Sequence, residues 1–239
     1  MKKNNLMEKR EKLYEGKAKI IYSTDDPKYV IQYFKDDATA FNGQKKDTIK
    51  NKGIVNNYVS SKIFEYLENS AVKTHFVKKL NDREMLCLRV DIIPIEVVMR
   101  NYTAGSICKR LGLEEGIRLY TPIIEYFYKN DELNDPLINE YHIKLLRLAT
   151  EGDLMEIRSK SYMVNCLVEM FFERYGIKLV DFKLEYGRVE DQIILADEIS
   201  GDTCRLWDMK TNKKLDKDVF RFDLGSTEDA YSEIYNRLI

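Results

Sequence analysis

The sequence predicts an α+β fold in two lobes, built from antiparallel sheets with flanking helices. Segments rich in β-branched and aromatic residues recur between turn residues along most of the chain. Helical spacing of apolar residues is confined to a few longer segments. A length of 239 residues is enough for one large domain or for two lobes. We place the lobes at residues 1–88 and 89–239.

The first lobe is expected to be rich in strands. Its segments with strand patterns are 12–22, 29–34, 74–79 and 84–93. Residues 35–52 are expected to form a loop, and residues 54–68 a helix. Pro94 would end or bend the last strand, because proline has no N–H for the ladder. Residues 85–90 would then connect the two lobes.

The second lobe is expected to mix strands and helices. Residues 94–100 have a strand pattern, and residues 130–136 read as a polar loop. The helices expected here are 106–111, capped by Ser106; 153–175, with an apolar stripe that includes Met163, Cys166 and Met170 and a stop at Gly176; and 229–238, capped by Ser226 or Thr227.

The composition excludes several classes of protein. Lys plus Arg (39) nearly balance Asp plus Glu (40), so broad nucleic-acid binding is not expected. The four cysteines are scattered without a CxxC pair, which predicts reduced and mostly buried thiols rather than zinc or disulfides. No segment has the apolar length of a membrane span, and the charged N-terminus lacks a signal-peptide core. We therefore expect a cytoplasmic protein without a membrane partner.

One segment, 180–186, alternates charged and apolar residues with the period of a strand. Its charged members, which share one face, are Asp181, Lys183 and Glu185. Residues 192–198 would pair with it as a hairpin and bring Asp197 near Glu185. Two carboxylates facing a ligand indicate a Mg²⁺ site, whereas an amphipathic strand with a solvated face would bind nothing. Lys183 on the same face favours a ligand, because a cation beside carboxylates can hold a phosphate or carboxylate substrate.

Two other motifs could bind anions. The turn Tyr14–Lys19 places a glycine and two lysines between strand segments, which suits phosphate oxygens but also a plain lysine-bearing hairpin. Residues 99–106 offer Arg100, a small-residue turn and Ser106 at a helix start, which suits an oxyanion but also a plain capped turn. The loop with Asn42 and Gly43 could be a surface loop or a mobile lid.

The chain resembles the SAICAR synthetase (phosphoribosylaminoimidazole-succinocarboxamide synthase) family. The motifs that carry the resemblance, in family order, are 14–19, 93–106, 130–139, 179–187, 196–198, 205–208 and 217–221. The resemblance runs from about residue 11 to the C-terminus. It implies a two-lobed ATP-grasp-like fold with ATP between the lobes. Residues 1–88 would then form the nucleotide-binding lobe, and residues 89–239 would carry the magnesium and imidazole-ribonucleotide sites.

The activity that the resemblance implies is an ATP-dependent ligation in de novo purine synthesis. Such enzymes condense 5-amino-1-(5-phospho-D-ribosyl)imidazole-4-carboxylate (CAIR) with L-aspartate, using ATP and Mg²⁺, to give SAICAR, ADP and phosphate. The route expected is an acyl phosphate that the aspartate amine attacks. Phosphoryl transfer needs positioning and charge neutralisation more than a protein nucleophile. The resemblance also implies a homodimer, the form that members of the family commonly adopt.

The resemblance assigns roles to particular residues. The ATP contacts are Lys17, Ala18 and Lys19 at the phosphates, the backbone of Cys87, Leu88 and Arg89 at adenine, and Glu185. The magnesium ligands are Glu185 and Asp197. The ribonucleotide contacts are Arg100, Ser106, Asp181, Lys183, Asp202, Arg205 and Arg221. Asp181 and Lys183 are the candidate catalytic residues, and Asp181 would either orient the exocyclic amine or help remove a proton.

The sequence departs from the family pattern at Gly201, where proline is common. Glycine is expected to loosen the loop that carries Asp202 and Arg205. The main rival hypotheses are another ATP-dependent ligase or small-molecule kinase, and a catalytically silent nucleotide-binding regulator. The 100–106 and 181–185 patterns argue against the first rival. The second would predict a lost magnesium ligand or phosphate lysine, and none of these positions is lost.

Overall fold

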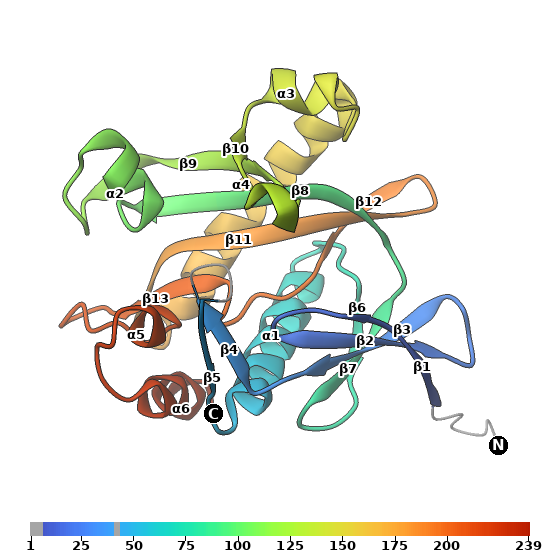
Figure 1. The fold of residues 1–239 in the computed structure, drawn as a ribbon, viewed down its shortest axis with the longest axis horizontal. Coiled ribbons are helices and arrows are strands. Elements are labelled where there is room, and N and C mark those ends of the chain that lie inside the picture. Colours follow the sequence, from blue (N-terminus) through green and yellow to red (C-terminus); the bar gives the residue numbers. More distant parts are fainter. Residues whose placement is uncertain (1–6, 41–43) are drawn as a thin grey trace.

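The computed structural model describes residues 7–40 and 44–239, so the Asn42–Gly43 turn of the expected loop lies outside the described residues. Figure 1 shows two antiparallel sheets, one above the other, with helices between and beside them. The five-stranded sheet has the order β1-β2-β3-β7-β6. Its strands are β1 (Lys9–Glu15), β2 (Lys19–Thr24), β3 (Tyr29–Phe34), β6 (Phe76–Lys79) and β7 (Glu84–Leu88).

The second sheet has the order β10-β9-β8-β11-β12, with β13 also paired to β11. Its strands are β8 (Asp91–Tyr102), β9 (Arg118–Tyr128), β10 (Leu137–Ile138), β11 (Ile177–Val189), β12 (Gln192–Ala196) and β13 (Cys204–Asp208). A hairpin of β4 (Asp37–Ala40) and β5 (Lys45–Thr48) forms a separate pair. The predicted α+β class with antiparallel sheets and flanking helices is confirmed.

The long helices pack against the sheets and against each other. The helices are α1 (Lys52–Asn69), α2 (Ser106–Leu111), α3 (Glu140–Leu145), α4 (Glu151–Glu173), α5 (Asp218–Arg221) and α6 (Thr227–Leu238), with a 3-10 turn η1 (Asp131–Leu133). Thr150 starts α4 with a capping box to Asp153, and Ser226 caps α6. Helix α1 contacts the first sheet, α4 and α6, and one hydrophobic core runs through both lobes.

Backbone bonds also tie the two sheets together. The N–H of His75 donates to the carbonyl of Leu195 at 2.8 Å, and the N–H of Leu195 donates to the carbonyl of Lys73 at 3.2 Å. These bonds join the segment before β6 to β12. They hold the end of β12, and therefore Asp197, against the first lobe.

The expected strand 84–93 is divided in two, since the chain leaves β7 at Leu88 and enters β8 at Asp91, and residues 89–90 connect the two sheets. Pro94 does not end a strand, because it lies inside β8, but it stands at an irregularity of the kind that bends a strand, which was the other half of the expectation. The β8–β11 register shifts between Glu185 and Gly187, opposite the stretch that contains Pro94. Proline is tolerated at such a bulge, where no ladder N–H is needed.

Two further local expectations were wrong at least in part. Residues 35–52 contain the β4–β5 hairpin rather than a plain loop. The predicted stripe of the long helix was partly out of phase, because its members Met163, Cys166 and Met170 are exposed, whereas its members Leu154, Ile157 and Phe171 are buried. The strand segment 12–22 with its turn at 14–19 forms the β1–β2 hairpin, which agrees with the expected turn between two strand segments. Among the described residues, no helix is long and apolar enough to cross a membrane.

Candidate active site

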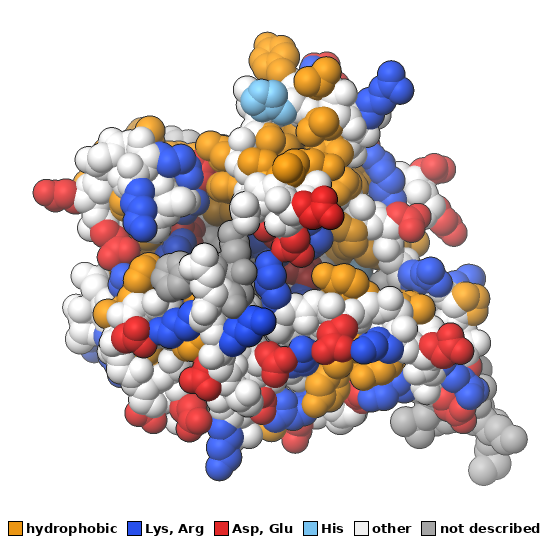
Figure 2. All heavy atoms as spheres, viewed as in Figure 1, with side chains coloured by type: hydrophobic (Ala, Val, Ile, Leu, Met, Phe, Trp, Pro, Cys, Tyr) orange, Lys and Arg blue, Asp and Glu red, His pale blue; other side chains and the backbone are white. Residues whose placement is uncertain are grey.

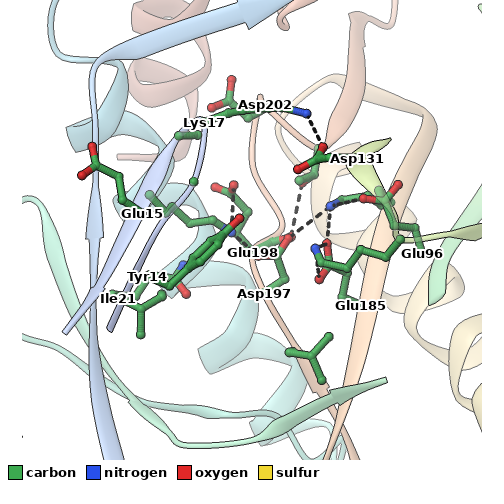
Figure 3. A pocket seen from close by; sticks show the side chains of 18 of the residues that line it. Tyr14, Glu15, Lys17, Ile21, Glu96, Asp131, Glu185, Asp197, Glu198 and Asp202 are labelled. Atoms are coloured by element: carbon green, nitrogen blue, oxygen red, sulfur yellow. Dashed lines mark hydrogen bonds and ion pairs between the residues drawn. The ribbon is translucent and has the colours of Figure 1, made fainter. Parts of the chain in front are cut away.

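A cleft of about 1070 Å³ separates the two lobes. Figure 2 shows the groove between the lobes, with charged side chains of both signs along it. Its cationic lining residues are Lys17, Lys19, Lys46, Arg89, Lys129, Lys183 and Lys217. Its acidic lining residues include Glu96, Asp131, Glu185, Asp197, Glu198 and Asp202. Figure 3 shows several of these side chains pointing toward one another across the cleft.

The turn between β1 and β2 supplies the first wall. Gly16 N–H donates to the carbonyl of Lys19 at 2.9 Å, which closes the turn and places Lys17, Ala18 and Lys19 in the cleft. Lys17 Nζ reaches across the cleft to Asp131 Oδ1 at 2.8 Å (Figure 3). Lys19 Nζ pairs with Asp197 and lies 3.2 Å from Glu198 Oε1. Both predicted phosphate lysines therefore occupy the cleft.

The connection between the two sheets contributes to the cleft lining. Of the residues 87–89 proposed for adenine, Leu88 and Arg89 line the cleft and Cys87 does not. The Cys87 side chain is fully buried in the core, and burial raises the pKa of its thiol. The N–H groups of Leu88 and Arg89 donate to the carbonyls of His75 and Lys28.

The second wall carries the carboxylates of β11 and β12. Glu185, which is 2 % exposed, accepts from Lys129 Nζ at 2.8 Å through both oxygens and also pairs with Lys183. Lys183 Nζ lies 2.9 Å from Glu96 Oε1 and 3.5 Å from Asp197 Oδ2. Glu185 faces Ala196 in the β11–β12 register, so the hairpin brings Asp197 beside it, as predicted.

Burial and neighbouring charges set the ionisation of this wall. Burial would raise the pKa of Asp197, but the ammonium groups of Lys19, Lys183 and Lys129 hold that pKa well below its usual range. Burial would likewise lower the pKa of Lys183, but Glu185 and Asp197 hold it well above its usual range. Glu198 behaves differently, because burial raises its pKa. The wall therefore carries fixed charges of both signs.

A second cluster lies beyond Lys183 on the same face of β11. Asp181 faces Arg100 in the β8–β11 register and Arg205 in the β11–β13 register. Arg100 Nη1 donates to Asp181 Oδ2 at 2.6 Å, and Arg205 Nη1 donates to both carboxyl oxygens at 2.9 and 3.0 Å. Asp181 is 3 % exposed, so the buried charge is matched by two guanidinium groups.

The ion pairs continue on both sides of this cluster. Arg100 Nε donates to Glu125 Oε2 at 2.8 Å, and Glu125 also pairs with Arg110. Arg205 Nε donates to Asp218 Oδ2 at 2.7 Å, and Arg221 Nη1 donates to Asp218 Oδ1 at 2.5 Å. The predicted residues Arg100, Asp181, Arg205 and Arg221 are thus brought together in what we call the guanidinium cluster. These four residues do not line the cleft itself.

Ser106 belongs to this cluster but does not cap its helix. Gly105 is the N-cap of α2, and the helix shows no side-chain cap. The Ser106 hydroxyl instead accepts from Arg100 Nη2 at 3.1 Å and from Arg110 Nη1 at 2.9 Å. The expectation that Ser106 caps α2 was wrong, because its hydroxyl oxygen accepts hydrogen bonds from these two guanidinium groups and not from the helix backbone.

Asp202 lies apart from the guanidinium cluster, in the wall of the cleft. It is almost fully buried, accepts from Tyr231 Oη at 2.8 Å and pairs with Lys52, which is 0 % exposed. The ring of Tyr231 covers Gly201, where an added Cβ would lie 2.9 Å from Tyr231 Cε1. The expected loosening at Gly201 is therefore not seen, because helix α6 packs its tyrosine into the space that glycine leaves.

Several residues of the site were missed by sequence reasoning. They are Lys129 at Glu185, Lys52 and Tyr231 at Asp202, and Glu125, Arg110 and Asp218 in the guanidinium cluster. Lys129 could have been found, since it immediately precedes a motif already recognised at 130–139. Lys52 and Tyr231 contact Asp202 from helices far apart in sequence, and nothing in the local sequence marks either as a partner of Asp202.

Fold and cleft together define a two-lobed α+β protein with antiparallel sheets and a cleft lined by charges of both signs. Comparison with known proteins is more specific. The family model of SAICAR synthetase matches residues 12–238. The phosphoribosylaminoimidazole-succinocarboxamide synthase of Caldanaerobacter subterraneus subsp. tengcongensis is 58 % identical over 232 residues, covering 97 % of this chain and 99 % of the relative. The chain belongs to the SAICAR synthetase family.

Solved structures agree with this assignment. The phosphoribosylaminoimidazole-succinocarboxamide synthase of Ehrlichia chaffeensis has 49 % sequence identity and a TM-score of 0.93, with coverage of 95 % of this chain and 98 % of that one. A SAICAR synthetase in complex with ADP, also 49 % identical, has a TM-score of 0.91 over 94 % of this chain and 96 % of that one. The predictions of the family, of its ligase class and of the fold are confirmed.

Proposed function

We propose that this chain condenses CAIR with L-aspartate at the expense of ATP, giving SAICAR, ADP and phosphate in de novo purine synthesis. One observation carries the proposal beyond family membership. The strand β11 presents Glu185 and Lys183 to the cleft and, two residues further along the same face, Asp181 to the guanidinium cluster. A single strand thus connects a phosphate-binding cleft to a second anion site about 7 Å away.

ATP would lie in the cleft with its phosphates toward Lys17 and Lys19. Both lysines come from the turn closed by Gly16, so their spacing is set by a short hairpin. Ala18 has no side chain beyond Cβ to obstruct the phosphates. The base would lie toward Leu88 and Arg89, whose N–H groups already donate to the carbonyls of His75 and Lys28.

Mg²⁺ fits the donor set of Glu185 and Asp197. Among the described residues, no group of three or more acidic, histidine or cysteine side chains forms a complete metal site. Mg²⁺ commonly takes only one or two carboxylates and completes its shell with substrate phosphates and water. Ammonium groups of Lys19, Lys129 and Lys183 lie at these two carboxylates. When bound, the metal would neutralise charge on the phosphates during transfer.

The imidazole ribonucleotide would bind at the guanidinium cluster. Arg100, Arg205 and Arg221 provide planar donors suited to a phosphate, and the Ser106 hydroxyl adds a further contact. Asp181 already accepts from two of these arginines, so its first role is to hold them in place. We place Asp181 as an orienting group for the exocyclic amine rather than as the base.

The residues then account for a carboxylate-to-acyl-phosphate route. Lys183 stands between the cleft and the guanidinium cluster and would hold the negative acceptor carboxylate close to the γ-phosphoryl group. The γ-phosphorus–oxygen bond to ADP breaks as the carboxylate oxygen bonds to phosphorus. The aspartate amine then attacks the acyl carbon, phosphate leaves, and the nitrogen loses a proton.

Association and location complete the proposal. We propose a homodimer in the cytoplasm, with no nucleic-acid partner.

Large apolar side chains are exposed around α3 and the start of α4, among them Tyr141 at 80 %, Leu145 at 78 % and Met155 at 65 %. Figure 2 shows hydrophobic side chains gathered in this region. Contiguous exposed apolar surface of this kind is typical of an interface. Light scattering on the purified chain measures the oligomeric state directly.

The activity is tested by ADP release and mass spectrometry of the product. Purified protein receives ATP and Mg²⁺, with CAIR and L-aspartate added separately and together. We expect the succinocarboxamide only when both are present. ADP release without this product would indicate another ligase or a kinase. No ATP turnover under any condition would indicate a silent nucleotide-binding protein.

A further inference from the structure

Arg110 and Glu125 lie in the guanidinium cluster, but the roles above leave both residues unused. Arg110 belongs to α2 and Glu125 to β9, at the end of the sheet that α2 adjoins (Figure 1). Arg110 Nη2 donates to Glu125 Oε1, and Arg100 Nε donates to the other carboxyl oxygen, Oε2, at 2.8 Å. The carboxylate therefore bridges two guanidinium groups, one from α2 and one from β8.

The same two guanidinium groups meet a second time at Ser106. Arg100 Nη2 donates to Ser106 Oγ at 3.1 Å, and Arg110 Nη1 donates to the same oxygen at 2.9 Å. The four bonds close a ring in which two arginines alternate with a carboxylate and a hydroxyl. Each guanidinium is held at two of its nitrogens, so the ring fixes the plane of both groups.

This ring determines what the Ser106 hydroxyl can do. A hydroxyl has two acceptor lone pairs and one O–H donor, whereas a guanidinium group can only donate. The two arginines take up the accepting capacity of Oγ, and neither can accept its proton. Within residues 7–40 and 44–239, no protein group accepts a hydrogen bond from this hydroxyl. Ser106 is exposed, so its O–H is left to donate to a ligand.

The ligand that suits this arrangement is a group that only accepts hydrogen bonds. The O–H and the guanidinium groups beside it are all donors, and phosphate oxygens are acceptors. Glu125 does not repel such an anion, because each of its oxygens is paired with a guanidinium group. Its side chain is 11 % exposed, against 31 % for Arg110. The carboxylate thus anchors an arginine that would otherwise extend into water.

We propose that Arg110 and Glu125 are positioning residues, which hold the Ser106 hydroxyl so that its O–H donates to a phosphate oxygen of the imidazole ribonucleotide. The inference rests on the proposed function and adds two residues to the ribonucleotide site. Arg110 acts through Ser106, and Glu125 acts through the two arginines that it bridges.

The first test is Arg110→Lys, which separates geometry from charge. Lysine keeps the positive charge, but its single ammonium group cannot reproduce the fork that spans Ser106 and Glu125. Initial rates are measured on the purified full chain, with CAIR varied at saturating ATP and L-aspartate. We expect the KM for CAIR to rise about 10-fold, as for loss of one charge-assisted hydrogen bond, and the KM for ATP to stay unchanged.

Lys109→Met is the matched control. Lys109 is the exposed neighbour of Arg110 on α2, and its replacement removes a positive charge from the same helix without touching the ring. The KM for CAIR should equal that of the wild type. A rise equal to that of Arg110→Lys would show that the ring is not the cause, and would overturn the inference.

Glu125→Gln gives a change whose sign is decisive. If Glu125 acted only through its charge, its removal would make the cluster more positive, and the KM for the anionic CAIR would fall. The positioning role predicts the opposite. Two guanidinium groups approach different oxygens of Glu125, and in the amide one of these positions becomes a donor. We therefore expect the KM for CAIR to rise, and a fall would overturn the inference.

A double-mutant cycle tests whether Arg110 acts through Ser106. Ser106→Ala should raise the KM for CAIR about 10-fold. The double variant Ser106→Ala, Arg110→Lys should agree with Ser106→Ala within about 2-fold, because the hydroxyl that Arg110 holds is already absent. Additive effects of the two substitutions would overturn the inference, since Arg110 would then act independently of Ser106.

Two further results separate this inference from the proposed function. Wild-type kinetics in a folded Arg110→Lys, with folding checked by circular dichroism, would overturn the positioning role and leave the proposed function intact. By contrast, absence of the succinocarboxamide with the wild-type protein would overturn the proposed function itself, and the role of Arg110 and Glu125 with it.

Discussion

The guanidinium of Arg205 occupies the space in which a side chain at Gly105 would begin. A Cβ at residue 105 would lie 2.7 Å from Arg205 Cζ, and Gly105 itself has a φ of +63°. The turn before α2 therefore needs glycine for two reasons, its backbone conformation and the close approach of the arginine. This pair connects two motifs that lie a hundred residues apart in the sequence.

Gly105→Ala should impair binding of the ribonucleotide. The methyl group would displace Arg205 from Asp181, and we expect the KM for CAIR to rise at least about 10-fold. Steady-state rates with varied CAIR measure this. Gly112→Ala is a control for an added methyl group at a positive φ, because Gly112 has a φ of +64° in the left-handed helical region and nothing within 4 Å of the added Cβ. Its cost should be limited to about 1 kcal/mol of stability. Equal KM values in the two variants would contradict the assignment.

Glu185→Gln should reduce turnover sharply and leave the protein folded. The amide keeps the shape of the side chain but removes the charge proposed to hold Mg²⁺, so we expect a fall of about 100-fold or more at every Mg²⁺ concentration. Circular dichroism checks folding. Glu96→Gln serves as the control, since Glu96 also lines the cleft and pairs with Lys183 at 2.9 Å but is not a proposed ligand. Near-normal activity of Glu185→Gln at saturating Mg²⁺ would refute the assignment.

Asp202→Asn should destabilise the protein in a pH-dependent way. Burial would raise the pKa of Asp202, but Lys52, Lys217 and the Tyr231 hydroxyl lower it below its ordinary 3.8. The folded state therefore binds fewer protons than the unfolded state, and this stability is present above pH 3.8 and lost as the pH falls further. Leaving Lys52 buried without its partner should cost about 3–5 kcal/mol at pH 7.

Urea unfolding at pH 7 and pH 3 measures this difference. The gap between wild type and Asp202→Asn should shrink at the lower pH. The double variant Lys52→Met, Asp202→Leu should recover much of the stability, because apolar replacement of a buried ion pair is often neutral. A gap that is the same at both pH values would show that the charge of Asp202 is not what stabilises the fold.

Lys17→Met should weaken ATP binding without affecting stability. The Lys17–Asp131 pair is exposed, at 52 % and 72 %, so its loss should change the free energy of unfolding by less than about 0.5 kcal/mol. The KM for ATP should rise about 10-fold, because a phosphate contact is removed. Lys12→Met is the control, since Lys12 lies on the same hairpin, pairs with Glu15 at 2.7 Å and does not line the cleft. If both substitutions raised the KM for ATP equally, the cause would be the loss of a positive charge near the cleft and not the loss of a phosphate contact.

The strand β11 shows how much a local pattern can predict. Its alternation of period two correctly placed Phe182, Leu184 and Tyr186 in the core and Asp181 and Glu185 on the opposite face. The same pattern could not decide whether that face is solvated. In the structure Asp181 and Glu185 are 3 % and 2 % exposed; Arg100 and Arg205 contact Asp181, and Lys129 contacts Glu185.

Some local expectations depended on partners that the local sequence does not contain. Pro94 lies inside β8, at an irregularity in its pairing with β11, and the ring of Tyr231 packs over Gly201. Both partners are far away in the chain, so no window of local sequence contains the information. Ser106 is a different case, because its partners Arg100 and Arg110 are only six and four residues away, and local sequence could not tell a capping hydroxyl from one that accepts from these arginines.

The sequence by itself determined the family, the fold class, the alternation of β11 and the identity of the main charged residues. These follow from side-chain type, periodicity and the order of motifs, which are properties of the chain alone. Only the tertiary structure decided which charges meet. Arg100, Asp181 and Arg205 become one cluster through the registers of three strands, and Lys52 and Tyr231 reach Asp202 from two helices. Pairing of buried charges depends on distances of a few ångströms, and the packed fold alone sets those distances.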